Sequence, residues 1–165
     1  MSVYETILKR RTIRKFKQEK ISREMFEKLI NAARLAPSAA NMQPLKYAII
    51  DDEVKVNQVF EHVKWAAYIA PEGTPSENER PTAFIAVLVD TEIKKNGYEL
   101  DIGAAVQNTL LTATEEGIGT CWMGAIDREK IREILKLPSQ YILNSVIALG
   151  YQGENPVCED ENGSI

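Results

Sequence analysis

A cluster of cations lies near the start of the sequence, where residues 9–16 read Lys-Arg-Arg-Thr-Ile-Arg-Lys-Phe. Arginine presents a planar fork that binds two phosphate oxygens at once, and a threonine hydroxyl beside it can add an uncharged hydrogen bond. This combination favours the binding of an anion. The alternative is a solvent-exposed basic surface, which a run of charges forms more often than a binding site.

A second polar stretch lies between Pro37 and Pro44, where the chain reads Ser-Ala-Ala-Asn-Met-Gln. Pro37 should end the preceding helix, and Pro44 should hold Gln43 in an extended conformation. The stretch carries one hydroxyl, two amides and no charge, so it can offer neutral side chains and backbone amides to a ligand. A plain polar connection between a helix and a strand has a similar composition, because serine and asparagine favour loops for local reasons.

The composition limits the classes of protein to which the chain can belong. With 165 residues, 44% of them hydrophobic and 27% charged, the chain suits a single domain over residues 1–165. A net charge of -4 argues against broad affinity for nucleic acid or for anionic membranes. The basic cluster should therefore bind a small partner. The longest apolar runs are too short to span a bilayer, and we expect a cytoplasmic protein.

The sequence offers little for metal or nucleophilic chemistry. Cys121 and Cys158 are the only cysteines and His62 is the only histidine. Their spacing fits neither a metal site nor a redox pair. Cys121 lies in an apolar strand, where a small buried thiol is usual, and the acidic surroundings of Cys158 would raise its pKa. We therefore predict no catalytic side chain and no metal.

Hydrophobic periodicity predicts the elements that must position the two polar stretches. Ser22 and Asp127 are the expected N-caps of two helices. The segment 70–81 has the composition of an exposed loop, and we expect the chain to lose order after about residue 153. Together the pattern indicates an α+β fold with a central, mainly antiparallel sheet flanked by helices. The expected helices cover residues 3–9, 23–35, 53–62, 98–116 and 127–135, and the expected strands cover residues 46–50, 82–89, 120–123 and 141–151.

The predicted helix over residues 98–116 is apolar on most of its circumference. It must be buried in the core of one chain or covered by a partner. Its small residues Gly103, Ala104 and Ala105 would let another helix approach closely. The residues alone favour the core of a monomer, whereas pairing with a second copy stays open.

Four stretches, in this order, resemble the FMN-dependent nitroreductase family. That family begins with an Arg-Arg/His-Ser-x-Arg/Lys-x-Phe motif, which residues 10–16 resemble, and continues with Pro-Ser-x-x-Asn-x-Gln-Pro, which residues 37–44 match. Residues 101–108 resemble its central helix, and residues 117–124 resemble the strand that reaches the flavin. The resemblance covers about residues 4–151 and implies a dimeric, nitroreductase-like fold.

The resemblance also implies an activity. It implies an FMN-dependent NAD(P)H oxidoreductase with a ping-pong mechanism, in which hydride from NADH or NADPH passes through flavin N5 to a nitroaromatic, a quinone or a similar acceptor. It further implies a homodimer with flavin sites at the subunit interface. Arg14 should reach the pyrimidine edge of the flavin, where a fixed cation stabilises the negative charge of the reduced form. The remaining implied contacts are Arg10, Arg11 and Thr12 with the phosphate and ribityl groups, Met123 and Gly124 with N5, and Pro37, Ser38, Ala39, Asn41 and Gln43 from the second subunit.

The C-terminal end of the chain departs from the family pattern. The family usually follows a Gly-Tyr-Pro strand with a lysine or arginine that completes the phosphate site. Here Gln152 follows Gly150 and Tyr151, and no lysine or arginine occurs after Lys136. A flavin-binding protein without nitroreductase turnover is therefore the alternative function.

Overall fold

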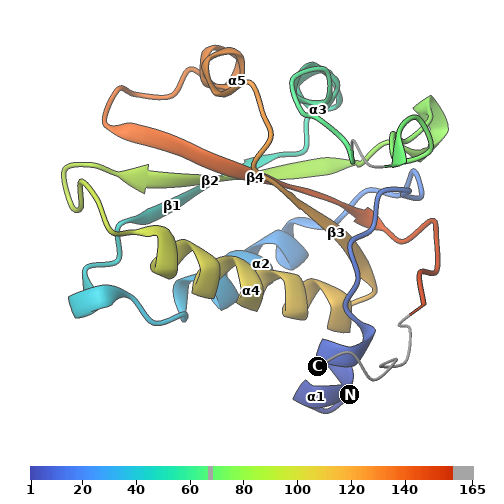
Figure 1. Cartoon of the computed structure of the whole chain (residues 1–165), viewed down its shortest axis with the longest axis horizontal. Coiled ribbons are helices and arrows are strands. Elements are labelled where there is room, and N and C mark those ends of the chain that lie inside the picture. Colours follow the sequence, from blue (N-terminus) through green and yellow to red (C-terminus); the bar gives the residue numbers. More distant parts are fainter. Residues whose placement is uncertain (67–68, 158–165) are drawn as a thin grey trace.

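The computed structural model describes residues 1–66 and 69–157. Within these ranges four strands form one antiparallel sheet in the order β1-β2-β4-β3 (Figure 1). This sheet confirms the predicted α+β class and the antiparallel pairing. Cys158 and most of the segment expected to lose order lie outside the described residues. The strands are β1 (Leu45–Ile50), β2 (Ala83–Asp90), β3 (Ile118–Met123) and β4 (Tyr141–Tyr151).

Helices cover both faces of the sheet. In Figure 1, α3 and α5 lie on one face and α2 and α4 on the other, while α1 lies beyond α4. Ser22 and Asp127 cap their helices as predicted, because each side chain accepts a backbone N–H of the first turn. In the described part of the chain the α-helices are α1 (Val3–Lys9), α2 (Arg23–Arg34), α3 (Glu53–Phe60), α4 (Glu99–Glu115) and α5 (Arg128–Leu135). None of these helices has the length and apolar character that a membrane crossing needs.

Strand β2 is the centre of the core. It pairs with β1 on one side and with β4 on the other, and all of its residues are buried. Burial on both faces explains why its sequence is apolar without alternation. One face packs against residues of α3 and α5, including Phe60 and Ile131, and the other packs against residues of α2 and α4, including Leu29 and Val106.

One face of helix α4 packs into the core of the single chain. Ile102, Ala105 and Val106 on this face are almost completely buried. The opposite face is less covered, and Leu100 on it is 86% exposed. Residues at helical spacing continue this exposed face along α4, and we call it the outer face of α4. It consists of Leu100, Gly103, Ala104, Gln107 and Leu111.

The segment over residues 70–81 is less open than its composition predicts. Gly73 and Pro75 are buried, and Glu77–Glu79 forms a short 3₁₀-helix that Ser76 caps. An added Cβ at Gly73 would lie only 2.8 Å from the side chain of Ile69, so the backbone folds back on itself there. Local packing of this kind is not visible in a polar composition.

Candidate functional site

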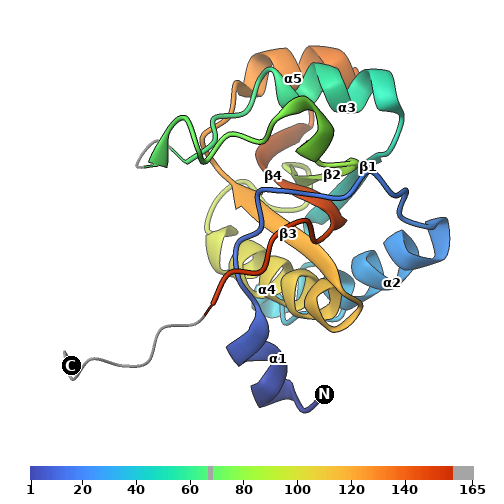
Figure 2. The same cartoon turned by 90° about the vertical axis from the view of Figure 1, so that its right-hand side faces the viewer.

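The basic segment, residues 10–16, meets the free edge of β3 at Thr12 and Ile13 and then reaches the end of β4, where Phe16 bridges Gln152. Thr12 forms a parallel bridge with Thr120, and the backbone N–H of Ile13 donates to the Thr120 carbonyl over 2.9 Å. Figure 2 shows this segment passing β3 after it leaves α1. Because β3 is the last strand of the sheet, its outer edge can accept such an addition.

Two glycines bring the basic segment close to the sheet. An added Cβ at Gly119 would lie 2.7 Å from Ile13 Cγ2, and one at Gly150 would lie 2.9 Å from Phe16 Cβ. Both distances are shorter than two non-bonded carbon atoms allow. Only glycine at these two positions therefore lets the basic segment approach the strands so closely. The side chains of Ile13 and Phe16 are buried as a result, and they fix the backbone that carries the neighbouring cations.

The cations of the basic segment keep most of their hydrogen-bonding capacity. Arg10, Arg11 and Arg14 are each partly buried, and none of the three forms an ion pair within the described residues. Lys15, in contrast, lies 3.6 Å from the Glu79 carboxylate. Three guanidinium groups within five residues, next to an exposed threonine hydroxyl, form a donor set that fits a phosphate group.

A second carboxylate, that of Glu154, contacts the backbone of the basic segment. The Glu154 carboxylate accepts the backbone N–H of Arg14 over 2.5 Å and that of Lys15 over 3.1 Å. Glu154 follows β4, the strand after which the family usually carries a cation. The missing cation after Tyr151 was predicted from the sequence, but a role for this acid was not. The available signal was an acid three residues after Tyr151, close to where the cation was expected.

The second polar stretch folds into a tight turn, the 3₁₀-helix Ala39–Asn41. The prediction that Pro44 holds Gln43 extended is wrong, because Gln43 has a φ of 53°. Ala40 also lies in this left-handed region, with a φ of 50°. Such angles are uncommon outside glycine and need support from surrounding contacts. The Ser38 hydroxyl provides one, because it accepts the Gln43 N–H over 3.0 Å.

Asp101, in the first turn of α4, anchors this loop. Its carboxylate accepts the Ala39 N–H over 3.0 Å and the Ser38 hydroxyl over 3.2 Å, and it pairs with Lys94 over 3.0 Å. Burial alone would raise the pKa of Asp101, but these three donors together hold it below its ordinary value. Asp101 begins the motif over residues 101–108, but no role was predicted for it. The available signal was a carboxylate on the buried face of an apolar helix.

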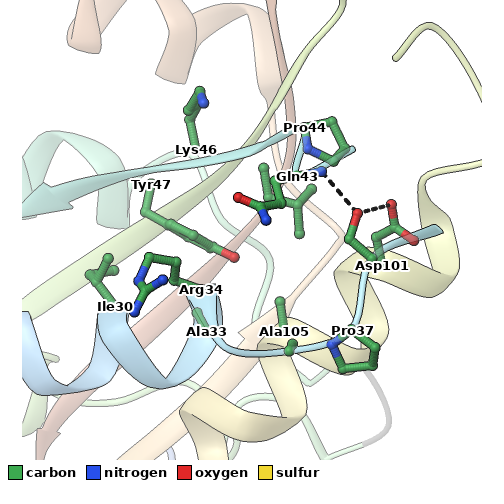
Figure 3. A pocket seen from close by; sticks show the side chains of 13 residues that line it. Ile30, Ala33, Arg34, Pro37, Gln43, Pro44, Lys46, Tyr47, Asp101 and Ala105 are labelled. Atoms are coloured by element: carbon green, nitrogen blue, oxygen red, sulfur yellow. Dashed lines mark hydrogen bonds between the residues drawn. The ribbon is translucent and has the colours of Figure 1, made fainter. Parts of the chain in front are cut away.

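A cavity of about 310 Å³ lies beneath the loop, between α2, β1 and α4 (Figure 3). The side chains of Gln43 and Tyr47 point into it, and Arg34 lies at its α2 side. Burial raises the pKa of Tyr47 to about 12, so the phenol stays neutral at physiological pH. The cavity therefore combines apolar walls with neutral groups of Gln43 and Tyr47 and with the charged residues Arg34, Lys46 and Asp101.

The end of β3 carries the two residues that were expected at flavin N5. The Met123 side chain is buried in the core, whereas Gly124 is exposed and its carbonyl accepts Arg128 over 3.0 Å. Cys121, on the same strand, is buried as predicted, and burial raises its thiol pKa to about 11.

The structure brings the predicted residues together in two separate groups. Arg10, Arg11, Thr12 and Arg14 lie along β3, the strand that ends at Met123 and Gly124, and the helix before them lies beside the C-terminal half of α4. The loop with Pro37, Ser38, Ala39, Asn41 and Gln43 lies at the N-terminal end of α4 (Figure 1). The 17 residues of α4 span about 25 Å. One described chain therefore does not unite the two groups.

Known proteins share both the sequence and the fold. A sequence model of the Nitroreductase family matches residues 7–151. A relative from Archaeoglobus fulgidus, named an NADH dehydrogenase/NAD(P)H nitroreductase, is 35% identical over 152 residues, which are 88% of this chain and 82% of the relative. A protein from Parabacteroides distasonis with the same name has a TM-score of 0.82 at 29% identity, covering 98% of this chain and 93% of that one.

A nitroreductase from Desulfovibrio desulfuricans, crystallised in complex with FMN, has a TM-score of 0.78 at 26% identity and covers 99% of this chain and 93% of that one. The family model spans most of the sequence, and these structures share the overall fold. The chain therefore belongs to the nitroreductase family.

Proposed function

We propose that this protein is an FMN-dependent NAD(P)H oxidoreductase. The observation that carries the proposal is the basic segment, in which Arg10, Arg11 and Arg14 form no ion pair within the described residues and are fixed on β3. Arg10, Arg11 and Thr12 would hold the phosphate and ribityl groups. Arg14 would place a fixed positive charge at the pyrimidine edge, where it stabilises the negative charge of reduced flavin.

Bound FMN would supply hydride chemistry at N5, accepting hydride from NADH or NADPH and passing it to a nitroaromatic, quinone or similar acceptor. The protein's own residues then bind and orient. The loop at Pro37 offers neutral donors and backbone amides held rigid by Asp101, and Gly124 offers exposed backbone at the end of β3. No side chain needs to act as an acid, a base or a nucleophile.

The same reasoning favours a homodimer. The loop and the basic segment lie at opposite ends of α4, so a complete site needs the loop of a second copy. The outer face of α4 supports this arrangement, because Leu100 is 86% exposed and small residues follow it at helical spacing. Two such faces can pack closely. Ala105, which sequence analysis grouped with the small residues of this contact, is buried inside the chain instead.

The visible spectrum of the purified protein tests the proposed function. We expect flavin absorption that bleaches when NADH or NADPH is added without oxygen. Bound flavin that does not bleach would favour the second candidate, a flavin-binding protein without turnover. The contact of Glu154 with the basic segment is the observation that favours this candidate, since an acid stands near the place of the family's cation. A protein that binds no flavin would contradict both candidates.

A further inference from the structure

The backbone after β4 carries an acid onto the basic segment. Tyr151 accepts the Lys17 N–H over 2.8 Å, and Gly153 donates to the Lys15 carbonyl over 2.8 Å. An added Cβ at Gly153 would lie 3.0 Å from the Lys15 carbonyl carbon, so the two backbones are in close contact. This pairing places the Glu154 carboxylate on the backbone N–H groups of Arg14 and Lys15. The fold therefore brings Glu154 to this position through backbone contacts. The side-chain rotamer only completes the contact.

The carboxylate takes up donors that an oxyanion ligand could use. Backbone N–H groups beside guanidinium groups are typical partners of phosphate. At the basic segment, two such N–H groups already bind Glu154, and the charge of Lys15 is directed to Glu79 over 3.6 Å. The guanidinium groups of Arg10, Arg11 and Arg14 and the Thr12 hydroxyl remain for a ligand, although Arg11 already donates to the Arg10 carbonyl. The Glu154 carboxylate adds a negative charge to the same segment.

We propose that Glu154 is a specificity-determining residue that weakens binding of the FMN phosphate and leaves binding of an unphosphorylated flavin unchanged. The inference rests on the proposed function, since it assigns the phosphate to the basic segment. Its physical basis is repulsion between the carboxylate, which lies on the backbone of Arg14 and Lys15, and a phosphate dianion held a few residues earlier by Arg10, Arg11 and Thr12. For partly exposed charges this repulsion amounts to about a three- to fivefold loss of affinity, and added salt should reduce it.

A purely structural role predicts a different result. If Glu154 only held the basic segment in place, its removal would weaken every ligand of that segment. Glutamine separates the two roles, because its amide oxygen can still accept both backbone N–H groups while the negative charge is lost. Glu129, in the first turn of α5 and exposed, offers a matched loss of one charge far from the basic segment.

The experiment is a titration of the flavin-free protein with FMN and with riboflavin. We expect Glu154→Gln to lower the dissociation constant of FMN about three- to fivefold and to leave that of riboflavin within twofold. Glu129→Gln should change neither constant. An unchanged ratio of FMN to riboflavin affinity in Glu154→Gln, or a parallel weakening of both flavins, would overturn the proposal.

Inorganic phosphate separates this proposal from the proposed function. If the wild type binds neither flavin, the proposed function fails, but the charge effect can still be measured by titration with phosphate. Glu154→Gln should then bind phosphate more tightly than the wild type, and equal binding would overturn the role of Glu154. Thermal unfolding of both variants checks that each is folded before its affinity is compared.

Discussion

The Asp101 carboxylate lies 3.0 Å from the ammonium nitrogen of Lys94, with side chains only 5% and 12% exposed. This buried pair joins the first turn of α4 to the segment before it, and the other bonds of the same carboxylate hold the loop at Ser38 and Ala39. One residue therefore fixes the geometry of the loop that the proposed site requires.

Replacing Asp101 with Asn should destabilise the protein by about 2–4 kcal/mol. The amide can still accept one N–H of the loop, but Lys94 loses its partner while it stays buried. Urea unfolding measures the loss. Adding Lys94→Met to Asp101→Asn should cost less than the sum of the two single changes, because it removes the unpaired charge. Additive losses would mean that the pair contributes no coupling.

The stability contributed by Asp101 should depend on pH. Its pKa in the folded protein is lowered, so the contribution is complete above the unfolded pKa of about 3.9 and is lost as the pH falls through the folded value. The difference in unfolding free energy between wild type and Asp101→Asn should thus be constant from about pH 7 to 5 and shrink below about pH 4. A difference that does not shrink down to about pH 3 would contradict the lowered pKa.

Gly119→Ala should displace the basic segment. The new methyl group would lie 2.7 Å from Ile13 Cγ2, and we expect a loss of about 1–3 kcal/mol of stability together with weaker flavin binding. The wild type is the reference for both measurements. Unchanged thermal unfolding of Gly119→Ala would show that the contact with Ile13 relaxes without cost.

Local patterns were enough to predict much of the fold. The N-caps at Ser22 and Asp127 and the buried strand β2 were readable because caps and burial leave a signature within a few residues. The conformation of Gln43 was predicted wrongly. A residue before proline usually adopts an extended backbone, but here the hydrogen bond from the Gln43 N–H to the Ser38 hydroxyl stabilises a positive φ.

The contacts that define the candidate site could not be predicted in the same way. The bond between Ser38 and Asp101 joins residues 63 apart in the sequence, and the one between Arg14 and Glu154 joins residues 140 apart. Such contacts depend on how the sheet and helices pack, which no local pattern encodes. The family motifs indicated which residues matter, but only the fold shows that one chain holds them as two groups.

The outer face of α4 should mediate the proposed dimer. Leu100→Glu places a charge on this exposed face, and we expect monomers with an unchanged circular dichroism spectrum in sedimentation experiments. Ala105→Glu should unfold the chain instead, because Ala105 is 1% exposed. Val54→Glu is the control, since Val54 is exposed on α3 across the sheet (Figure 1) and should leave the dimer intact. A wild-type protein that sediments as a monomer with bound flavin would contradict the shared site.

Arg10→Ala should lose FMN more severely than Lys15→Ala. Arg10 forms no ion pair within the described residues and is free to contact a phosphate, whereas the ammonium group of Lys15 already pairs with Glu79 over 3.6 Å. Losing one charge-assisted contact should cost about 1.5–3 kcal/mol, which is about a tenfold to hundredfold loss of affinity. Titration of both flavin-free variants with FMN measures the difference. Equal dissociation constants would mean that the phosphate does not bind at Arg10, and the proposed orientation of the flavin along β3 would have to be abandoned.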